Sequence, residues 1–501
     1  MKKLALALST VAAFAAPTFA ADLPARTYSK APAMAVTVTD WTGCYVGGGG
    51  GYGMWNQENS TFGGGPPPIP AGDTVTTGGR GYFGTVQIGC DYQFAAAGGN
   101  FVVGAFGDYD FASLKGTLAP SGASMVGEEK MSSAWAVGGR LGWLVSPSFL
   151  TYFSAGYTEA TFDRTNLSFN FPPFVSANRF LDKQTYKGWF VGAGNEYALD
   201  ILPGLFWKNE YRFSEFDAAT NSIRLTATGL PSGVSEDSKK FVHTVRSELV
   251  YRFNWGGSAP AKTYAKGPAS PTPVVNWTGC YVGGGGGYGL WNQENTTYDD
   301  GPPRTRFSES ATTGGRGYLG TVQGGCDYQL GAAGARFVVG AFGDYDFSSL
   351  KGNLNPQRVN GVGDEKMSSA WSAGGRLGWL ALPNLLTYVS VGYTEATFDR
   401  TDFTGISAPF GVPAGLFTDK RTYKGWFIGA GDEYALNFLP GLFWKNEYRF
   451  SEFDVATNPI RITATGLPTG VSIDSEKYTH TVRSQLVYRF NWGGGAVVAK
   501  Y

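Results

Sequence analysis

Stretches of about ten residues with alternating apolar and polar side chains set the fold that this chain can adopt. In 82–94, Val86 and Ile88 have one parity, and Thr85 and Gln87 have the other. Similar stretches occupy 42–56, 101–111, 131–145, 149–162, 185–199, 205–213 and 245–253. Period two is that of a β-strand with one apolar face, and its repetition in short segments is typical of membrane β-barrels. We therefore predict eight strands in the first half of the chain.

The second half repeats this pattern. WTGCYV at 41–46 recurs at 277–282, and RSELVYRFNWGG at 246–257 recurs as RSQLVYRFNWGG at 483–494. The period is far longer than the roughly 20 to 50 residues of a solenoid unit, so each copy has the size of a domain. The residues between the copies resemble the chain's own C-terminal tail followed by its N-terminal arm. This arrangement suggests two complete proteins fused head to tail.

The first twenty residues read as a secretory signal peptide, with Lys2 and Lys3 before an apolar stretch and small residues at its end. The rest of the sequence contains no run of 18 apolar residues, so no membrane helix is predicted. We predict six parts: signal peptide 1–20, periplasmic arm 21–40, outer-membrane β-barrel 41–255, linker 256–276, second β-barrel 277–492 and C-terminal tail 493–501.

The predicted fold is all-β, with two tandem eight-stranded antiparallel transmembrane β-barrels. Short turns at 95–100, 146–148 and 200–204 alternate with long polar loops at 57–76, 112–128, 163–184 and 215–240, as in outer-membrane barrels. A soluble β-sandwich does not require this alternation. One sixteen-stranded barrel is the alternative, and the linker, longer than the other periplasmic turns, argues against it.

Charge excludes one class of partner. The chain has 40 Lys and Arg and 40 Asp and Glu, and removal of Lys2 and Lys3 leaves a net charge of about −2. A nucleic-acid partner needs a basic face, so none is expected.

The inward parity of the predicted strands collects charges of both signs. An eight-stranded barrel has room only for its own side chains, and buried charges must be paired, so we expect a salt-bridged interior rather than an ion path. The predicted charge network consists of Asp108, Arg140, Glu196, Lys208, Glu210, Arg212, Arg246 and Arg252, and of Asp344, Arg376, Glu433, Lys445, Glu447, Arg449, Arg483 and Arg489.

Each copy contains two cysteines, and the sequence separation between the two is the same in both copies. Cys44 begins the first predicted strand and Cys90 ends the second, so they are neighbours in an antiparallel hairpin. The exported compartment is oxidising, and we predict disulfides Cys44–Cys90 and Cys280–Cys326. A metal site is disfavoured because neither pair has another ligand at metal-binding spacing.

No catalytic or cofactor-binding residue is predicted. GGGGYG at 48–53 fits a dinucleotide motif but lies within a strand and is followed by no βαβ pattern. His243 and Ser247 share parity but lie about 13 Å apart along a strand, too far for a nucleophile and its base. We therefore expect no enzyme.

The order of several motifs resembles a known family. WTGCYVGGGGGYG, GWFVGAGNEYAL, KNEYRF and a closing VYRF are together similar to the small outer-membrane immunogenic proteins of the porin family, which have an OmpA-type eight-stranded barrel. The resemblance implies a surface-exposed outer-membrane barrel without catalytic residues. It also implies that the closing-strand aromatics Phe253 and Phe490 are read by the barrel-assembly machinery. Members usually have one barrel, whereas this chain has two copies, and Cys44 and Cys90 stand where we expect aromatic residues.

The predicted function is structural: membrane integrity and external loops that meet a host or environmental surface ligand. The alternative is a porin-type passive diffusion channel for small solutes. The expected partners are outer-membrane lipid, lipopolysaccharide and, during biogenesis, the assembly machinery.

Overall fold

The computed structural model describes residues 40–490 apart from 66, 97, 98, 200, 254–274, 331–335, 358, 360, 406–412 and 437–438. The predicted signal peptide and C-terminal tail, and all but the last residues of the arm and linker, lie outside this part. Every regular element in the described residues is a β-strand. No described helix could cross a membrane.

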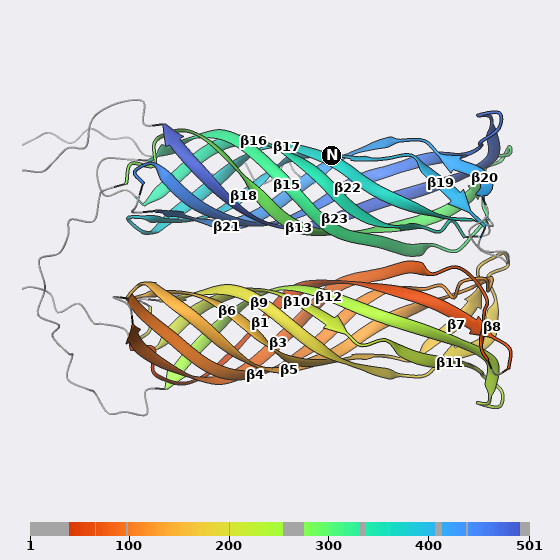
Figure 1. The fold of residues 1–501 in the computed structure, drawn as a ribbon, viewed down its shortest axis with the longest axis horizontal. Coiled ribbons are helices and arrows are strands. Elements are labelled where there is room, and N and C mark those ends of the chain that lie inside the picture. The colour runs from red at the N-terminus through yellow and green to blue at the C-terminus, as the bar shows by residue number, and fades with distance from the viewer. Residues whose placement is uncertain are drawn as a thin grey trace, which may run out of the picture. The chain divides into compact units, whose positions relative to one another are not determined.

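Eight strands of the first copy pair in a closed antiparallel cycle, here called the first ring (Figure 1). The last member pairs with the first over most of its length, from Cys44 opposite Phe253 to Gly63 opposite Val234. In pairing order the ring consists of β1 (Gly43–Gly63), β3 (Val75–Ala96), β4 (Gly99–Leu118), β5 (Met125–Ser146), β6 (Phe149–Phe162), β9 (Gln184–Ala198), β10 (Leu205–Phe216) and β12 (Pro231–Phe253).

The second copy forms an equivalent cycle, the second ring. Cys280 lies opposite Phe490 where the cycle closes. Its members are β13 (Gly279–Asp299), β15 (Ala311–Gln329), β16 (Phe337–Leu354), β17 (Val362–Leu382), β18 (Leu385–Phe398), β21 (Arg421–Ala435), β22 (Leu442–Ile462) and β23 (Pro468–Phe490).

Shorter strands lie in the connections at one end of each ring (Figure 1). In the first copy they are β2 (Ile69–Pro70), β7 (Thr165–Phe169), β8 (Ser176–Leu181) and β11 (Ala219–Leu225). In the second they are β14 (Thr305–Arg306), β19 (Thr401–Thr404) and β20 (Pro413–Thr418).

The prediction of two separate eight-stranded barrels is wrong, although eight strands close each ring, because each copy contains further strands and the two copies share one sheet. The first copy contains β1 to β12 and the second β13 to β23, and a pairing of Thr77 with Thr313 between β3 and β15 joins all of them into one 23-stranded sheet. The sixteen-stranded alternative does not form either, because β12 returns to β1 and β23 returns to β13.

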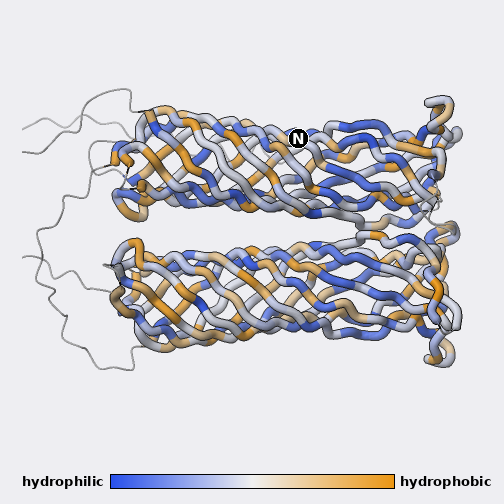
Figure 2. The backbone as a smooth tube through the Cα atoms, in the orientation of Figure 1, coloured by the Kyte–Doolittle hydropathy of each residue, from blue (hydrophilic) through white to orange (hydrophobic). Residues whose placement is uncertain are grey.

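The extra strand length lies where long loops were predicted. β1 and β3 continue through 57–63 and 75–81, where inward Gln57, Thr61 and Thr77 have polar neighbours on the other parity. With polar residues on both faces, this part of the ladder has no apolar alternation that the sequence could reveal. Figure 2 shows the same change along each ring, from mixed colours to a mostly hydrophilic part.

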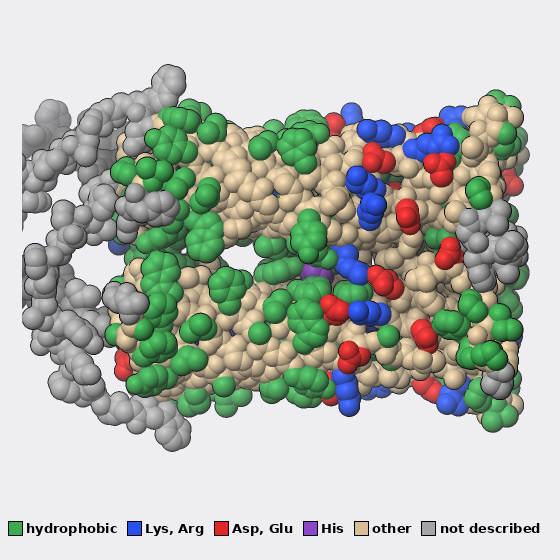
Figure 3. All heavy atoms as spheres, viewed as in Figure 1, with side chains coloured by type: hydrophobic (Ala, Val, Ile, Leu, Met, Phe, Trp, Pro, Cys, Tyr) green, Lys and Arg blue, Asp and Glu red, His purple; other side chains and the backbone are tan. Residues whose placement is uncertain are grey.

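On the face shown in Figure 3, large apolar side chains gather on the outside of the other part of each ring. Tyr82 is 74% exposed, Phe153 71% and Ile88 62%. On a soluble protein such a surface would be unusually apolar, whereas a lipid-facing barrel wall needs it.

Candidate functional site: the charged interior

The inward faces of the first ring hold four groups of charged side chains, here called tiers 1 to 4. The strand register places them, because alternate residues of every ring strand point inward. One close approach needs glycine: a Cβ on Gly104 would lie 1.9 Å from Asp91 Oδ1. A larger residue there would displace the carboxylate on which tier 1 is built.

Tier 1 is a cycle of two arginines and two carboxylates. Arg140 donates to Asp91, with Nε 2.9 Å from Oδ1, and to Glu196, with Nη1 2.9 Å from Oε2. Arg252 binds the same two acids, at 2.6 Å to Asp91 and 2.8 Å to Glu196. Arg252 also donates to the Trp41 carbonyl at 3.1 Å, and the Trp41 indole lies under its guanidinium. Trp41 is fully buried and closes this end of the interior.

Tier 2 is centred on Lys208. Its ammonium lies 3.2 Å from Glu248 and 3.7 Å from Glu210, and it donates to Gln87 at 2.7 Å. The Tyr152 hydroxyl donates to Glu210 at 2.9 Å. One cation therefore serves two carboxylates here.

Tier 3 shares arginines between neighbouring acids. Arg212 contacts both Asp108 and Glu210 at 2.8 Å. Arg246 lies 3.0 Å from Asp110 and 3.4 Å from Asp108. These side chains line a cavity of about 10 Å³, roughly the space that one water needs.

Tier 4 lies in the polar extension of the ring. Lys240 binds Glu129 at 2.7 Å and also donates to Gln57. The Thr61 hydroxyl donates to Glu236 at 2.6 Å.

The second ring repeats tiers 1 to 3 in most details. Arg376 and Arg489 both contact Asp327 and Glu433, and Arg449 contacts Asp344 at 2.8 Å. Every residue of the predicted charge network is buried in the structure. The prediction omitted further buried charges on the same parity, namely Asp91, Asp110, Glu129, Glu236, Lys240 and Glu248 with Asp327, Asp346, Glu365 and Lys477. Parity alone could have found Asp91, Asp110 and Glu248, whereas Glu236 and Lys240 fall in the predicted loop 215–240 and Glu129 lies between a predicted loop and a predicted strand.

Both predicted disulfides are present. Cys44 and Cys90 are directly opposite in the β1–β3 register and are joined by a bond of 1.99 Å, and Cys280 and Cys326 are joined at 2.04 Å. Phe253 and Phe490 end β12 and β23 and are each 41% exposed. Recognition of these two aromatics by the assembly machinery stays a prediction.

His243 does not face Ser247 as a catalytic base would. Its Nδ1 lies 2.5 Å from the Tyr211 hydroxyl, and its ring stacks on Tyr288 of the second ring. Ser247 accepts a hydrogen bond from Trp207 at 2.7 Å.

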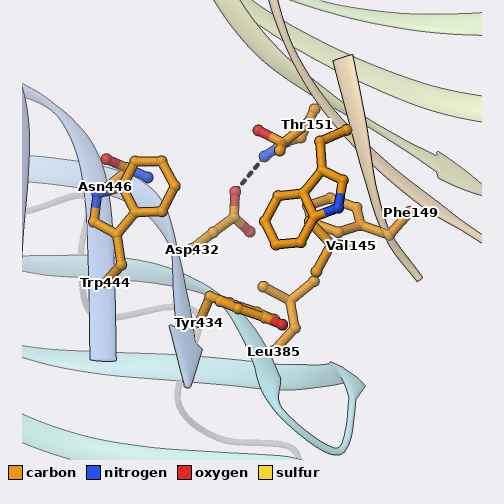
Figure 4. Close-up of a pocket in the computed structure, with 10 residues that line it drawn as sticks. Val145, Phe149, Thr151, Leu385, Asp432, Tyr434, Trp444 and Asn446 are labelled. Atoms are coloured by element: carbon orange, nitrogen blue, oxygen red, sulfur yellow. Dashed lines mark hydrogen bonds between the residues drawn. The ribbon is translucent and has the colours of Figure 1, made fainter. Parts of the chain in front are cut away.

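Outward-facing side chains connect the two rings in reciprocal pairs. Arg80 binds Glu294 at 2.6 Å, and the equivalent Arg316 binds Glu58 at 2.7 Å. Figure 4 shows a second contact, around a cavity of about 50 Å³, where the Asp432 carboxylate accepts a hydrogen bond from Asn195. Both ion pairs lie in the polar extension of the rings, and in each the arginine is more buried than the glutamate.

Closed antiparallel strands, an apolar outer band and a polar interior define an outer-membrane β-barrel protein. The sequence is distantly homologous to the 31 kDa outer-membrane immunogenic protein of Brucella melitensis. The two are 29% identical over 257 residues, which cover 50% of this chain and 100% of the relative. The protein of the same description from Brucella suis matches equally. No family model matches the chain.

Several solved outer-membrane proteins align with the structure. A Pseudomonas aeruginosa FadL homologue covers 90% of this chain and 91% of its own at 13% identity and a TM-score of 0.26. The toluene transporter TbuX of Ralstonia pickettii covers 88% and 90% at 8% identity and 0.23. Ail, the attachment invasion locus protein of Yersinia pestis, covers 41% and 99% at 12% identity and 0.17. At these scores they assign neither a strand number nor a substrate to this chain.

The predicted function needs correction. The first two of these structures, which span most of the chain, are described as a FadL homologue and a transporter rather than as structural surface proteins. The purely structural interpretation is corrected to its alternative, a diffusion channel, and the channel is argued below from the interior of the rings and not from these alignments.

Proposed function

We propose that the protein is a narrow diffusion channel for small ions in the outer membrane. The observation that carries this proposal is the sharing of cations in tiers 1 to 3. Arg212 holds Asp108 and Glu210, and Arg246 holds Asp108 and Asp110. A guanidinium can thus leave one carboxylate and keep the other, so the interior can open locally without stranding a buried charge.

Stability does not account for this interior. Desolvation of buried ion pairs offsets most of their attraction, and apolar side chains of similar volume are often as stabilising. We reverse the expectation that a salt-bridged interior excludes an ion path, because the cations of tiers 1 to 3 are shared between acids. A path for ions needs polar groups in the interior, and the four tiers supply them between buried apolar clusters such as that of Phe106 and Phe190.

Conductance of the full chain in planar bilayers tests the proposal. We expect small single-channel steps from the wild type and larger steps after Asp108→Ser with Arg212→Ser, which removes one acid and one base, leaves the interior charge unchanged and widens tier 3. The matched control is Lys115→Ser with Glu128→Ser, an exposed ion pair of 2.9 Å. Inserted, folded protein that passes no ions in either the wild type or the widened variant refutes the proposal.

The remaining partners stay proposals. Lipopolysaccharide around the outer wall, the assembly machinery at Phe253 and Phe490, and a host or environmental ligand at the external loops all follow from the resemblance. The absence of catalysis also stays a prediction.

A further inference from the structure

The buried charge differs between the two rings. The first ring buries eight carboxylates, Asp91, Asp108, Asp110, Glu129, Glu196, Glu210, Glu236 and Glu248, against six cations, Arg140, Lys208, Arg212, Lys240, Arg246 and Arg252. The second ring buries six of each, Asp327, Asp344, Asp346, Glu365, Glu433 and Glu447 with Arg376, Lys445, Arg449, Lys477, Arg483 and Arg489. Among the described residues, therefore, the first interior alone has a surplus of buried negative charge.

Two positions create the whole difference. Glu236 lies opposite Thr61 in the first ring, and Ile473 lies opposite Thr297 at the equivalent place in the second. Glu248 lies opposite Gly49, and Gln485 lies opposite Gly285. The strand register is the same, so the substitutions change charge without changing the fold around them.

Both surplus carboxylates have an oxygen without a hydrogen-bond partner among the described residues. Oε1 of Glu236 and Oε1 of Glu248 are each fully enclosed and unpartnered there. Lys240 follows Glu236 on the same face of β12, but its ammonium binds Glu129 at 2.7 Å. Lys208 is shared between Glu248 and Glu210. A buried, charged carboxylate without its own cation is very costly, so each of these groups must be neutralised by a bound cation or by a proton.

We propose that the first ring binds and preferentially passes small monovalent cations at Glu236 and Glu248, and that the second ring has no such preference. This inference rests on the proposed channel function and names its substrate class. Each surplus carboxylate adds one negative charge, which one monovalent ion would balance. Thr61, Glu129 and Lys240 surround Glu236 on the inward face, and Asp237 follows it with the outward parity.

Reversal potentials of the full chain in a KCl gradient test the preference. The wild type is expected to favour K⁺ over Cl⁻. The variant Glu236→Ile with Glu248→Gln gives the first ring the residues of the second, and its permeability should become nearly equal for the two ions. The converse variant, Ile473→Glu with Gln485→Glu, should increase the preference for K⁺. Conductance with an unchanged permeability ratio in both variants overturns the inference and leaves the channel function standing.

A second readout does not depend on conduction. The folded wild type should resist urea better in KCl than in choline chloride, whose cation is too large for the interior, and Glu236→Ile with Glu248→Gln should abolish this difference. If protons neutralise Glu236 and Glu248 instead, the two salts will have equal effects near neutral pH, and that result also overturns the inference. Absence of conductance in every variant, with the salt effect intact, would refute only the channel.

Discussion

Removal of Arg252 should destabilise the first ring by an amount that the structure lets us estimate. Arg252 supplies one of two positive charges in tier 1 and binds Asp91, Glu196 and the Trp41 carbonyl. After Arg252→Met, two carboxylates share Arg140 in a site closed to water. Loss of one partner from a buried ion pair costs roughly 3–5 kcal/mol, mostly because the other charge is left uncompensated.

The double variant Arg252→Met with Glu196→Gln separates charge from packing. It leaves one acid and one base in tier 1, Asp91 and Arg140. We therefore expect the double variant to regain all but about 1–2 kcal/mol of the lost unfolding free energy. The exposed pair of Lys115 and Glu128 is the control, and its removal should cost less than about 1 kcal/mol.

Urea unfolding of the full chain in lipid vesicles measures these differences, with the folded form followed by its migration in unboiled gels. Arg489→Met provides an independent repeat, because Arg489 contacts Asp327 and Glu433 at 2.7 Å in the second ring. A loss for Arg252→Met no larger than that of the control, or a double variant less stable than the single one, would refute the reasoning.

Three other substitutions probe the walls of the rings. Cys44→Ser opens a disulfide that spans 46 residues and should lower the unfolding free energy by about 2–4 kcal/mol under oxidising conditions only, measured with and without reductant. Arg80→Glu should let the two halves separate in mild detergent after cleavage of a protease site in the linker, and adding Glu294→Arg should hold them together again. Gly116→Ala should cost about 1–3 kcal/mol because its Cβ would lie 1.9 Å from a backbone oxygen, whereas Gly63→Ala, which meets nothing within 4 Å, should be neutral in the same unfolding assay.

The sequence predicted the lipid-facing half of each ring well. Tyr82, Ile88 and Phe153 alternate with small or polar residues because lipid lies on one side and a crowded interior on the other. The cysteine pairing followed from the same hairpin geometry. The length and the number of the strands were not predicted: β1 continues through 57–61, where both faces are polar and the pattern that marks a strand is absent, and short strands such as β7 and β8 lie in a predicted loop.

The charge network was predicted in its members but not in its connections. Parity placed Arg140 and Glu196 inside, yet the contact of Arg140 with Asp91 depends on the relative heights of three tilted strands. Sequence spacing carries no information on that height. The reciprocal contacts of Arg80 and Arg316 were also missed, because outward charges on a barrel wall look like ordinary surface residues until a neighbour covers them.

The two rings are tied together on the outside and are free of one another on the inside. A substitution at Arg80 breaks its ion pair with Glu294. Residues that contact one another across the outer faces are therefore expected to change together. Glu236 and Ile473 contact nothing in common, and each interior can take up substitutions that the other never experiences. An assembly of two identical chains could not do this, because one altered gene would alter both interiors. A single chain with both rings can instead carry two interiors with different side chains, each suited to a different solute.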